Sequence, residues 1–527
     1  MRRLLLIFLI LSPLLANAEP VKTAYRPKLI IFIIHGFLGG PDSFCDMSEV
    51  LKEKLGYGVE VEYLTYPTKG LDAAGRDSSN HVDNVNVLGF TRKIFEDIAN
   101  YYDENMYPAD TPYAIITHSQ GGLVATRLFL DCHQKGVEYC TRNIKRKSLS
   151  ELPKNMTHYF SIMTPFWGST TATYLKDSAF YRKFFPNAQL HNLSVGSDIV
   201  TYNRSLLMEG HQHNYQIKQR PEVINIAGNA SQTWLGSLIS WISDKPQNQT
   251  LETDFVVPIP SARLDFMYYD YTKDSPKIGK TEYADYFYSL NGNHIDVPMS
   301  DEGLACVSWK NYLTTPTFPI IRKHLAPMLG LQENPIFTNI FKDMSIFPPN
   351  IESFILEVQL EIPKDMPKIF NFDTEDIEVS IKNPMTTKLY KLHRKNDLMN
   401  SYLAFNTDEY EKNSYVTYYA TGTFLDEFSY VINRSFKTDE ENTPTEDLEV
   451  KINLPWFKSK TVDVKVSPSY TTYTKVKLDP KWNDFVPTVD IDKKTVQPLS
   501  IMHIKNQWRI LTYNPSTQNF DYSESSE

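Results

Sequence analysis

The chain has 527 residues, of which 41% are hydrophobic and 22% are charged, and its formal net charge at pH 7 is -9. This length exceeds what one ordinary hydrophobic core can hold, so we expect two domains. A mean hydropathy of -0.37 excludes a protein with many membrane spans, and the acidic balance argues against nucleic acid as a partner.

The first 18 residues have the three parts of an export signal. Arg2 and Arg3 precede an apolar run over residues 4–15, and small residues follow at 16–18 (ANA). Signal peptidases cut after such an A-x-A pattern, so we expect cleavage near Ala18. A retained anchor is the less favoured alternative, because the run is shorter than the roughly 20 residues that span a bilayer. The predicted protein is exported, either secreted or periplasmic.

The four cysteines predict no zinc site. Cys45, Cys132, Cys140 and Cys306 include no C-x-x-C spacing. In an exported protein Cys132 and Cys140 could close a short loop, with the other two as a second disulfide. Four reduced and buried thiols are an equally good interpretation.

Strands and helices alternate through the first part of the chain. Apolar runs bounded by turn residues predict strands, and apolar positions at helical spacing predict helices between them. The strands are expected at residues 28–34, 59–66, 112–117, 159–163, 222–227 and 283–290, and the helices at 42–55, 85–102 and 120–133. This alternation predicts a mostly parallel sheet that is covered by helices on both faces.

The strand at 112–117 leads into a serine that is followed closely by two glycines. The run AIITHSQGG at 114–122 places Ser119 between a buried strand and a helix. A plain strand-to-helix turn is one interpretation. The other is a nucleophile elbow, in which a sharp turn lifts the serine hydroxyl towards a substrate. A hydroxyl is a poor nucleophile at neutral pH, so Ser119 then needs a base within hydrogen-bond reach.

An acid and a base follow later strands in the order that such a site requires. Asp254 lies in the run TDFVVP after the strand at 222–227, and His294 directly follows the strand at 283–290. Because the carboxyl ends of parallel strands meet at one edge of a sheet, we expect both near Ser119. His294 is the predicted base, and Asp254 would fix its tautomer and stabilise its cation. The alternative acids are Asp198, Asp265, Asp270 and Asp285.

Two backbone N–H groups are predicted to form an oxyanion hole. Phe37 follows the first strand in the run HGF, and Gln120 begins the helix after Ser119, whose dipole favours negative charge. His35 is expected to position this loop. His118 is not predicted to be the base, because its side chain is expected to point away from the Ser119 hydroxyl.

Together these stretches resemble the secreted lipases and esterases of the α/β-hydrolase superfamily, over roughly residues 28–330. The resemblance rests on HGFLGG at 35–40, THSQGG at 117–122, TPFWGS at 164–169, DFVVP at 254–258 and NH at 293–294. One departure is Thr117, where the family usually has glycine two residues before the nucleophile. The resemblance implies an α/β-hydrolase fold and cleavage of carboxylic esters by Ser119, His294 and Asp254, without a cofactor.

Calcium is an open alternative to a site without metal. Asp296 resembles a calcium ligand of some secreted lipases, where it orders the histidine loop. A second acidic ligand is not identifiable in the sequence, so we predict no metal.

Two apolar insertions bear on the substrate. Residues 174–185 and 234–242 would form a lid and a surface that contacts lipid, or would pack over the sheet as core helices. Export, an acyl-transfer site and these insertions favour a lipid ester. The alternatives are an acyltransferase that uses the same triad and a non-catalytic binding protein on a hydrolase scaffold.

The character of the chain changes beyond residue 331. Residues 332–350 contain repeated prolines and predict a linker between a catalytic domain at 19–331 and a β-rich domain at 351–527. Alternation with period two predicts short strands there, at 354–362, 377–381, 415–423, 448–454, 462–466 and 473–478. We expect a β-sandwich. It would bind a substrate, cell surface or lipid, or would only stabilise the chain.

Overall fold

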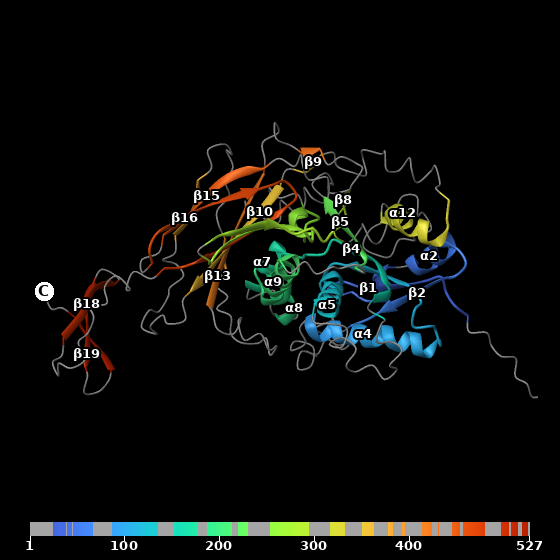
Figure 1. Cartoon of the computed structure of the whole chain (residues 1–527), viewed down its shortest axis with the longest axis horizontal. Helices are drawn as coiled ribbons and strands as arrows, with labels where there is room; N and C mark the ends of the chain where they lie inside the picture. Colours follow the sequence, from blue (N-terminus) through green and yellow to red (C-terminus); the bar gives the residue numbers. More distant parts are fainter. Residues whose placement is uncertain are drawn as a thin grey trace, which may run out of the picture.

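The structure is a computed structural model (Figure 1). It describes residues 25–37, 39–44, 46–66, 87–134, 152, 154–177, 187–212, 220–229, 253–273, 275–292, 294, 317–332, 350–351, 353–362, 378–382, 393–395, 414–423, 430–431, 445–453, 457–479, 497–504, 507–514 and 519–524. Outside these residues lie the predicted signal peptide, the apolar insertion at 234–242, most of the insertion at 174–185 and of the linker, three of the cysteines and Asp296. Among the described residues, none of the helices has both the length and the hydropathy of a membrane span.

Six parallel strands form the central sheet. They are β1 (Leu29–Ile34), β2 (Val59–Leu64), β3 (Tyr113–His118), β4 (Met156–Ile162), β5 (Glu222–Asn229) and β8 (Tyr286–Asn291), in the spatial order β2-β1-β3-β4-β5-β8. Every neighbouring pair in this sheet runs parallel. All six residues of β1 and of β3 are buried, as continuous apolar strands require when both faces are covered.

Helices cover both faces of this sheet. On one face α2 (Met47–Leu55) and α12 (Thr317–Leu329) pack with Leu29, Ile31 and Ile33 of β1. On the other face α4 (Val87–Glu104) and α5 (Gln120–Gln134) pack with the alternate residues of β1, beside α7 (Thr170–Asp177), α8 (Asn187–Leu193) and α9 (Asp198–Gln212). The predicted parallel sheet with helices on both faces is confirmed. The helix expected from residue 42 instead begins at Met47, after a 3-10 turn, η1 (Pro41–Phe44).

The later part of the chain is rich in strands. One six-stranded sheet has the order β12-β13-β10-β17-β6-β7, and a three-stranded sheet has the order β11-β15-β16. The strands are β6 (Phe266–Tyr271), β7 (Lys277–Lys280), β10 (Ser353–Ile362), β11 (Glu378–Lys382), β12 (His393–Lys395), β13 (Ser414–Thr423), β15 (Glu446–Asn453), β16 (Lys460–Val466) and β17 (Thr471–Lys477). Apolar residues of β10, β15, β16 and β17 share one core, so the two sheets pack face to face.

Two small sheets complete the described strands. β9 (Asn350–Ile351) pairs with β14 (Tyr430–Val431), and an antiparallel meander contains β18 (Gln497–Ile504), β19 (Gln507–Asn514) and β20 (Asn519–Glu524). The meander lies beyond the strands that the sequence pattern predicts.

The large β-rich sheet crosses the domain boundary that the sequence predicts. β6 and β7 precede residue 331, yet β6 pairs in parallel with β17, from Phe266 opposite Thr471 to Tyr271 opposite Val476. β6 and β7 therefore belong to the same sheet as β10, β12, β13 and β17. The predicted boundary at 332–350 therefore does not separate the two sets of paired strands. Composition along the chain does not reveal that β6 pairs with a strand about 200 residues further on.

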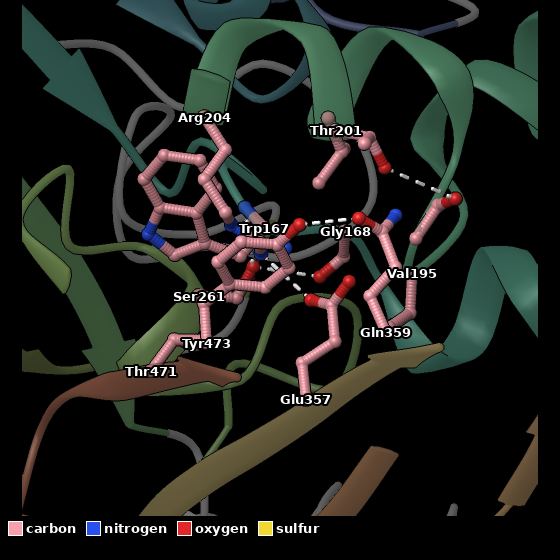
Figure 2. A network of polar contacts seen from close by, with 12 residues as sticks. Trp167, Gly168, Val195, Thr201, Arg204, Ser261, Glu357, Gln359, Thr471 and Tyr473 are labelled. Carbon is pink, nitrogen blue, oxygen red and sulfur yellow. Dashed lines mark hydrogen bonds and ion pairs between the residues drawn. The ribbon is translucent and has the colours of Figure 1, made fainter. Parts of the chain in front are cut away.

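A buried ion pair links the helical layer to the β-rich part (Figure 2). Arg204 on α9 donates from Nη2 to Oε2 of Glu357 on β10 at 2.6 Å, and both side chains are fully buried. The Arg204 guanidinium carbon lies 4.9 Å from the ring centre of Trp167 and 4.3 Å from that of Tyr473. A buried charge is strongly destabilising without its partner, so the fold depends on this contact between its two parts.

Candidate active site

Ser119 occupies a strained turn between β3 and α5. Its φ is 52°, in the left-handed region that residues with a side chain rarely adopt. Its N–H donates to the Ile162 carbonyl of β4 at 2.9 Å, which holds the turn against the neighbouring strand. A Cβ at Gly121 would lie 2.4 Å from the His35 carbonyl oxygen, so only glycine fits there. Strain and close approach together favour a nucleophile elbow over a plain turn.

Thr117, two residues before Ser119, packs inside the sheet. Its side chain is fully buried, and its hydroxyl donates to the Phe160 carbonyl of β4 at 3.1 Å. The Thr117 side chain is therefore held by a hydrogen bond across the sheet.

Asp254 and His294 form a hydrogen-bonded pair after β5 and β8. The Nδ1 atom of His294 lies 2.7 Å from Oδ2 of Asp254, whose carboxyl is buried. The other carboxylate oxygen, Oδ1, accepts the N–H groups of Val256 and Val257 at 2.9 and 2.6 Å. Since the carboxylate fixes the proton of a neutral imidazole on Nδ1, Nε2 of His294 is left as an acceptor.

The acid loop is held by the TPFWGS segment and by the β-rich part. Ser169 donates from its hydroxyl to the Val256 carbonyl at 2.5 Å, and Thr171 donates to the Phe255 carbonyl at 2.9 Å. Downstream, the 3-10 turn η4 (Ile259–Ser261) receives a hydrogen bond from Thr471 of β17 to the Pro260 carbonyl at 3.1 Å. Figure 2 shows the adjacent contact of Ser261 with Gly168, which joins the two loops. These contacts hold the backbone on both sides of the acid loop in place.

Three of the alternative acids serve other groups. Asp265 accepts the N–H groups of Tyr283 and Ala284, and burial raises its pKa to about 6. Asp285 forms a bidentate ion pair with Arg220, and Asp270 accepts from Thr272. Among the described hydrogen bonds, Asp254 is the carboxylate that meets His294.

The elbow and the histidine loop are joined through His118, the residue before Ser119. Nε2 of His118 lies 2.8 Å from the His294 carbonyl oxygen, and the two ring centres are 4.7 Å apart. A Cβ at Gly36 would lie 2.8 Å from Cβ of Ser119, so the loop after β1 packs against the same turn. Ser119, Asp254 and His294 thus follow β3, β5 and β8 at the carboxyl edge of the sheet.

The two predicted oxyanion residues lie beside the elbow. Gln120 is the first residue of α5 and is fully buried, and its N–H lies in the first turn, where helices lack internal acceptors. Phe37 is partly buried and follows Gly36. His35 donates from Nδ1 to the Gly36 carbonyl at 3.0 Å and stacks on Tyr66, whose hydroxyl donates to the His35 carbonyl at 2.8 Å.

Tyr66 and the His118 contact were not found by sequence reasoning. The sequence predicts Tyr66 only as the end of a strand. Neither Tyr66 nor His118 lies in a sequence pattern that indicates its contact with a loop far away in the chain. In the part of the chain that the structure describes, no group of three His, Cys, Asp or Glu side chains is arranged to hold a metal ion.

Comparisons with known proteins support the fold. No family model and no curated protein sequence matches the chain. Among solved structures, phospholipase PlaB from Legionella pneumophila matches 89% of this chain and 97% of its own, with a TM-score of 0.54 and 13% sequence identity. The lipase BlEst2 from Bacillus licheniformis in its mature form covers 59% of this chain and 96% of its own, with a TM-score of 0.31 and 14% identity.

The fold class predicted from the sequence is therefore confirmed. The chain has an α/β-hydrolase fold with a parallel central sheet, followed by a part that is rich in antiparallel strand pairs. Its overall arrangement is similar to that of phospholipase PlaB, whose whole length it nearly covers.

Proposed function

We propose that this protein is a serine hydrolase that cleaves carboxylic esters. One observation carries the proposal: the strained turn at Ser119 lies at the same sheet edge as the buried Asp254–His294 pair, and His118 links the two directly. A merely structural turn needs neither the strain nor the hydrogen-bonded pair.

The reaction proceeds through an acyl-enzyme. As Oγ of Ser119 attacks the ester carbonyl carbon, Nε2 of His294 takes the hydroxyl proton, and Asp254 stabilises the resulting imidazolium without itself becoming protonated. The N–H groups of Phe37 and Gln120 stabilise the negative oxygen of the tetrahedral intermediate. When the intermediate collapses, the C–O bond breaks and His294 gives its proton to the leaving alcohol. Water then attacks the acyl-enzyme by the same steps, which releases the acid and frees Ser119.

The substrates are lipid esters, and the protein acts after export. PlaB, the solved structure of similar fold described above, is a phospholipase. The apolar insertions at 174–185 and 234–242 would contact the acyl chains or the lipid surface, and the signal sequence at 1–18 would direct export with cleavage near Ala18. No cofactor is proposed.

A panel of esters tests this function. The purified mature protein is given p-nitrophenyl esters of short and long acyl chains, a triglyceride and a phospholipid, beside Ser119→Ala. Hydrolysis that rises with chain length and is lost in Ser119→Ala is the expected result. Activity that survives in Ser119→Ala, or a folded wild type that cleaves no ester, contradicts the proposal. Ester formation with an added alcohol acceptor would instead indicate an acyltransferase.

A further inference from the structure

His118 has a contact that the proposed reaction does not use. It is the last residue of β3, it is buried, and its Nε2 lies 2.8 Å from the carbonyl oxygen of His294. We propose that His118 is a positioning residue, which holds the loop of the base His294 against the serine elbow through this hydrogen bond. The inference rests on the proposed function and adds to it a residue outside the triad.

The contact with the His294 carbonyl fixes which nitrogen of His118 carries a proton. A carbonyl oxygen carries no hydrogen, so Nε2 of His118 must be the donor. A neutral imidazole with its proton on Nε2 supplies this single donor. Burial lowers the pKa of His118 well below the ordinary value of 6.5, and the neighbouring His294 and His35 add to the effect. The lowered pKa favours the neutral form of His118, with its proton on Nε2.

The neutral form of His118 matters because its ring packs beside that of His294. The ring centres of His118 and His294 are 4.7 Å apart, and His294 becomes a cation when it takes the serine proton. A positive charge on His118 would oppose that cation at short range. A neutral donor holds the loop without this repulsion.

Three hydrogen bonds then fix His294 as a unit. Its N–H donates to the backbone carbonyl of Asp254 at 3.0 Å, its Nδ1 meets the Asp254 carboxylate, and its carbonyl accepts from His118. The first two bonds tie the base to the acid loop. The third ties the backbone of His294 to His118, the residue before Ser119.

The packing around His118 leaves its ring little freedom. The Phe44 ring meets it edge to face with ring centres 6.4 Å apart, and an added Cβ at Gly36 would lie 3.1 Å from Nδ1. A second interpretation follows from the same contacts: the ring could simply fill space beneath the elbow. The two interpretations differ in whether the N–H donor or the ring shape is required.

Two variants separate the donor from the ring. His118→Phe keeps a ring and removes the donor, whereas His118→Gln keeps a neutral N–H donor and removes the ring. If the donor positions the base, His118→Phe lowers kcat by about 10- to 100-fold, the order expected for a misplaced catalytic group, with KM changed by less than about twofold. His118→Gln then restores most of kcat. The matched control is His158→Phe, another buried histidine, on β4, which keeps wild-type kcat.

The outcomes distinguish this inference from the proposed function. Equal losses in both variants, or a folded His118→Phe with wild-type kcat, overturn the positioning role even when Ser119→Ala is inactive. Ester cleavage that persists in Ser119→Ala overturns the proposed function instead. The wild type supplies a readout that needs no folded variant: nitrogen NMR of ¹⁵N-histidine protein should show His118 as the neutral Nε2–H tautomer at pH 6.5. A proton on Nδ1 only, or a cationic ring at that pH, contradicts the inference.

Discussion

Two carboxylate–histidine pairs lie at opposite edges of the central sheet. At the carboxyl edge Nδ1 of His294 meets Asp254, beside the turn that carries Ser119. At the amino edge Nδ1 of His324, on α12, meets Glu222, the first residue of β5, and its Nε2 lies 2.9 Å from the hydroxyl of Tyr288. Both edges therefore contain a carboxylate, an imidazole and a hydroxyl.

The two pairs differ in the burial of the carboxylate and in the kind of hydroxyl beside them. The Asp254 side chain is 1% exposed and is held by two backbone N–H groups, whereas the Glu222 side chain is 36% exposed. The hydroxyl at the carboxyl edge belongs to a serine on a strained turn at a helix start. The hydroxyl at the amino edge belongs to Tyr288, and burial raises the pKa of Tyr288 above its ordinary value. The strained turn and the N–H groups at the start of α5 are what distinguish the proposed active site from the pair at the amino edge.

The largest expected difference comes from replacing the histidine of each pair by glutamine. His294→Gln should lower kcat by about 10⁴-fold or more, because it removes the proposed base and residues of a triad act as a unit. His324→Gln should leave kcat within about threefold while lowering the thermal midpoint, because it breaks only a structural contact. Steady-state kinetics and thermal unfolding of both variants check this. Comparable losses of kcat would mean that the two edges are not functionally distinct.

Removing the charge of each carboxylate tests the same difference between the two edges of the sheet. Asp254→Asn should lower kcat by about 10³- to 10⁴-fold, since the amide no longer selects the tautomer that leaves Nε2 free. Glu222→Gln should leave kcat near the wild-type value. The measurement is kcat at pH 7 for both variants at equal folded fraction, and a catalytic loss in Glu222→Gln of similar size would contradict the assignment.

A third buried pair shows what a purely structural ion pair contributes. Glu357→Gln leaves the fully buried guanidinium of Arg204 without its counter-charge, so the free energy of unfolding should fall by about 3–5 kcal/mol. Asp110→Asn breaks the exposed pair with Arg26 and serves as the control, with a change below about 1 kcal/mol. Urea unfolding followed by far-UV circular dichroism measures both. Equal stability of the two variants would show that the contact with the β-rich part is dispensable.

The smallest effect is a dependence of stability on acid. Burial acts to raise the pKa of Glu222, but the hydrogen bond from His324 and the charges of His324, His158 and Arg220 outweigh it, so the pKa lies below the ordinary 4.5. A lowered carboxyl pKa gives stability that is present above 4.5 and is lost as the pH falls through the folded-state value. Glu222→Gln should therefore lose less stability than the wild type between pH 5 and 3. Parallel curves for the two proteins would contradict this linkage.

Local patterns predicted the central sheet well. The runs at β1, β3 and β5 are continuous, apolar and bounded by turn residues, so sequence alone identifies them as buried strands. The order of polar residues after these strands also selected Asp254 and His294, and the structure brings them into one hydrogen bond. Their catalytic roles stay predictions.

Contacts between distant segments escaped the same reasoning. β6 has the sequence FMYYDY, which shows no alternation and gives no sign that it pairs with β17. Arg204 and Glu357 are charged residues on a helix and a strand, and such residues are normally solvated, so only the packed fold reveals their burial. His118 was set aside as the base, yet its contact with the His294 backbone depends on two loops that meet only in three dimensions.

Covalent labelling by a fluorophosphonate tests the role of Ser119 as a nucleophile most directly. The mature protein, Ser119→Ala, His294→Gln and His324→Gln are treated side by side, and the adduct is mapped by peptide mass spectrometry. We expect one adduct, on Ser119, which is absent in Ser119→Ala, forms much more slowly in His294→Gln and forms at the wild-type rate in His324→Gln. A folded wild type that is not labelled, an adduct on another residue, or equal slowing in the two histidine variants would contradict this expectation.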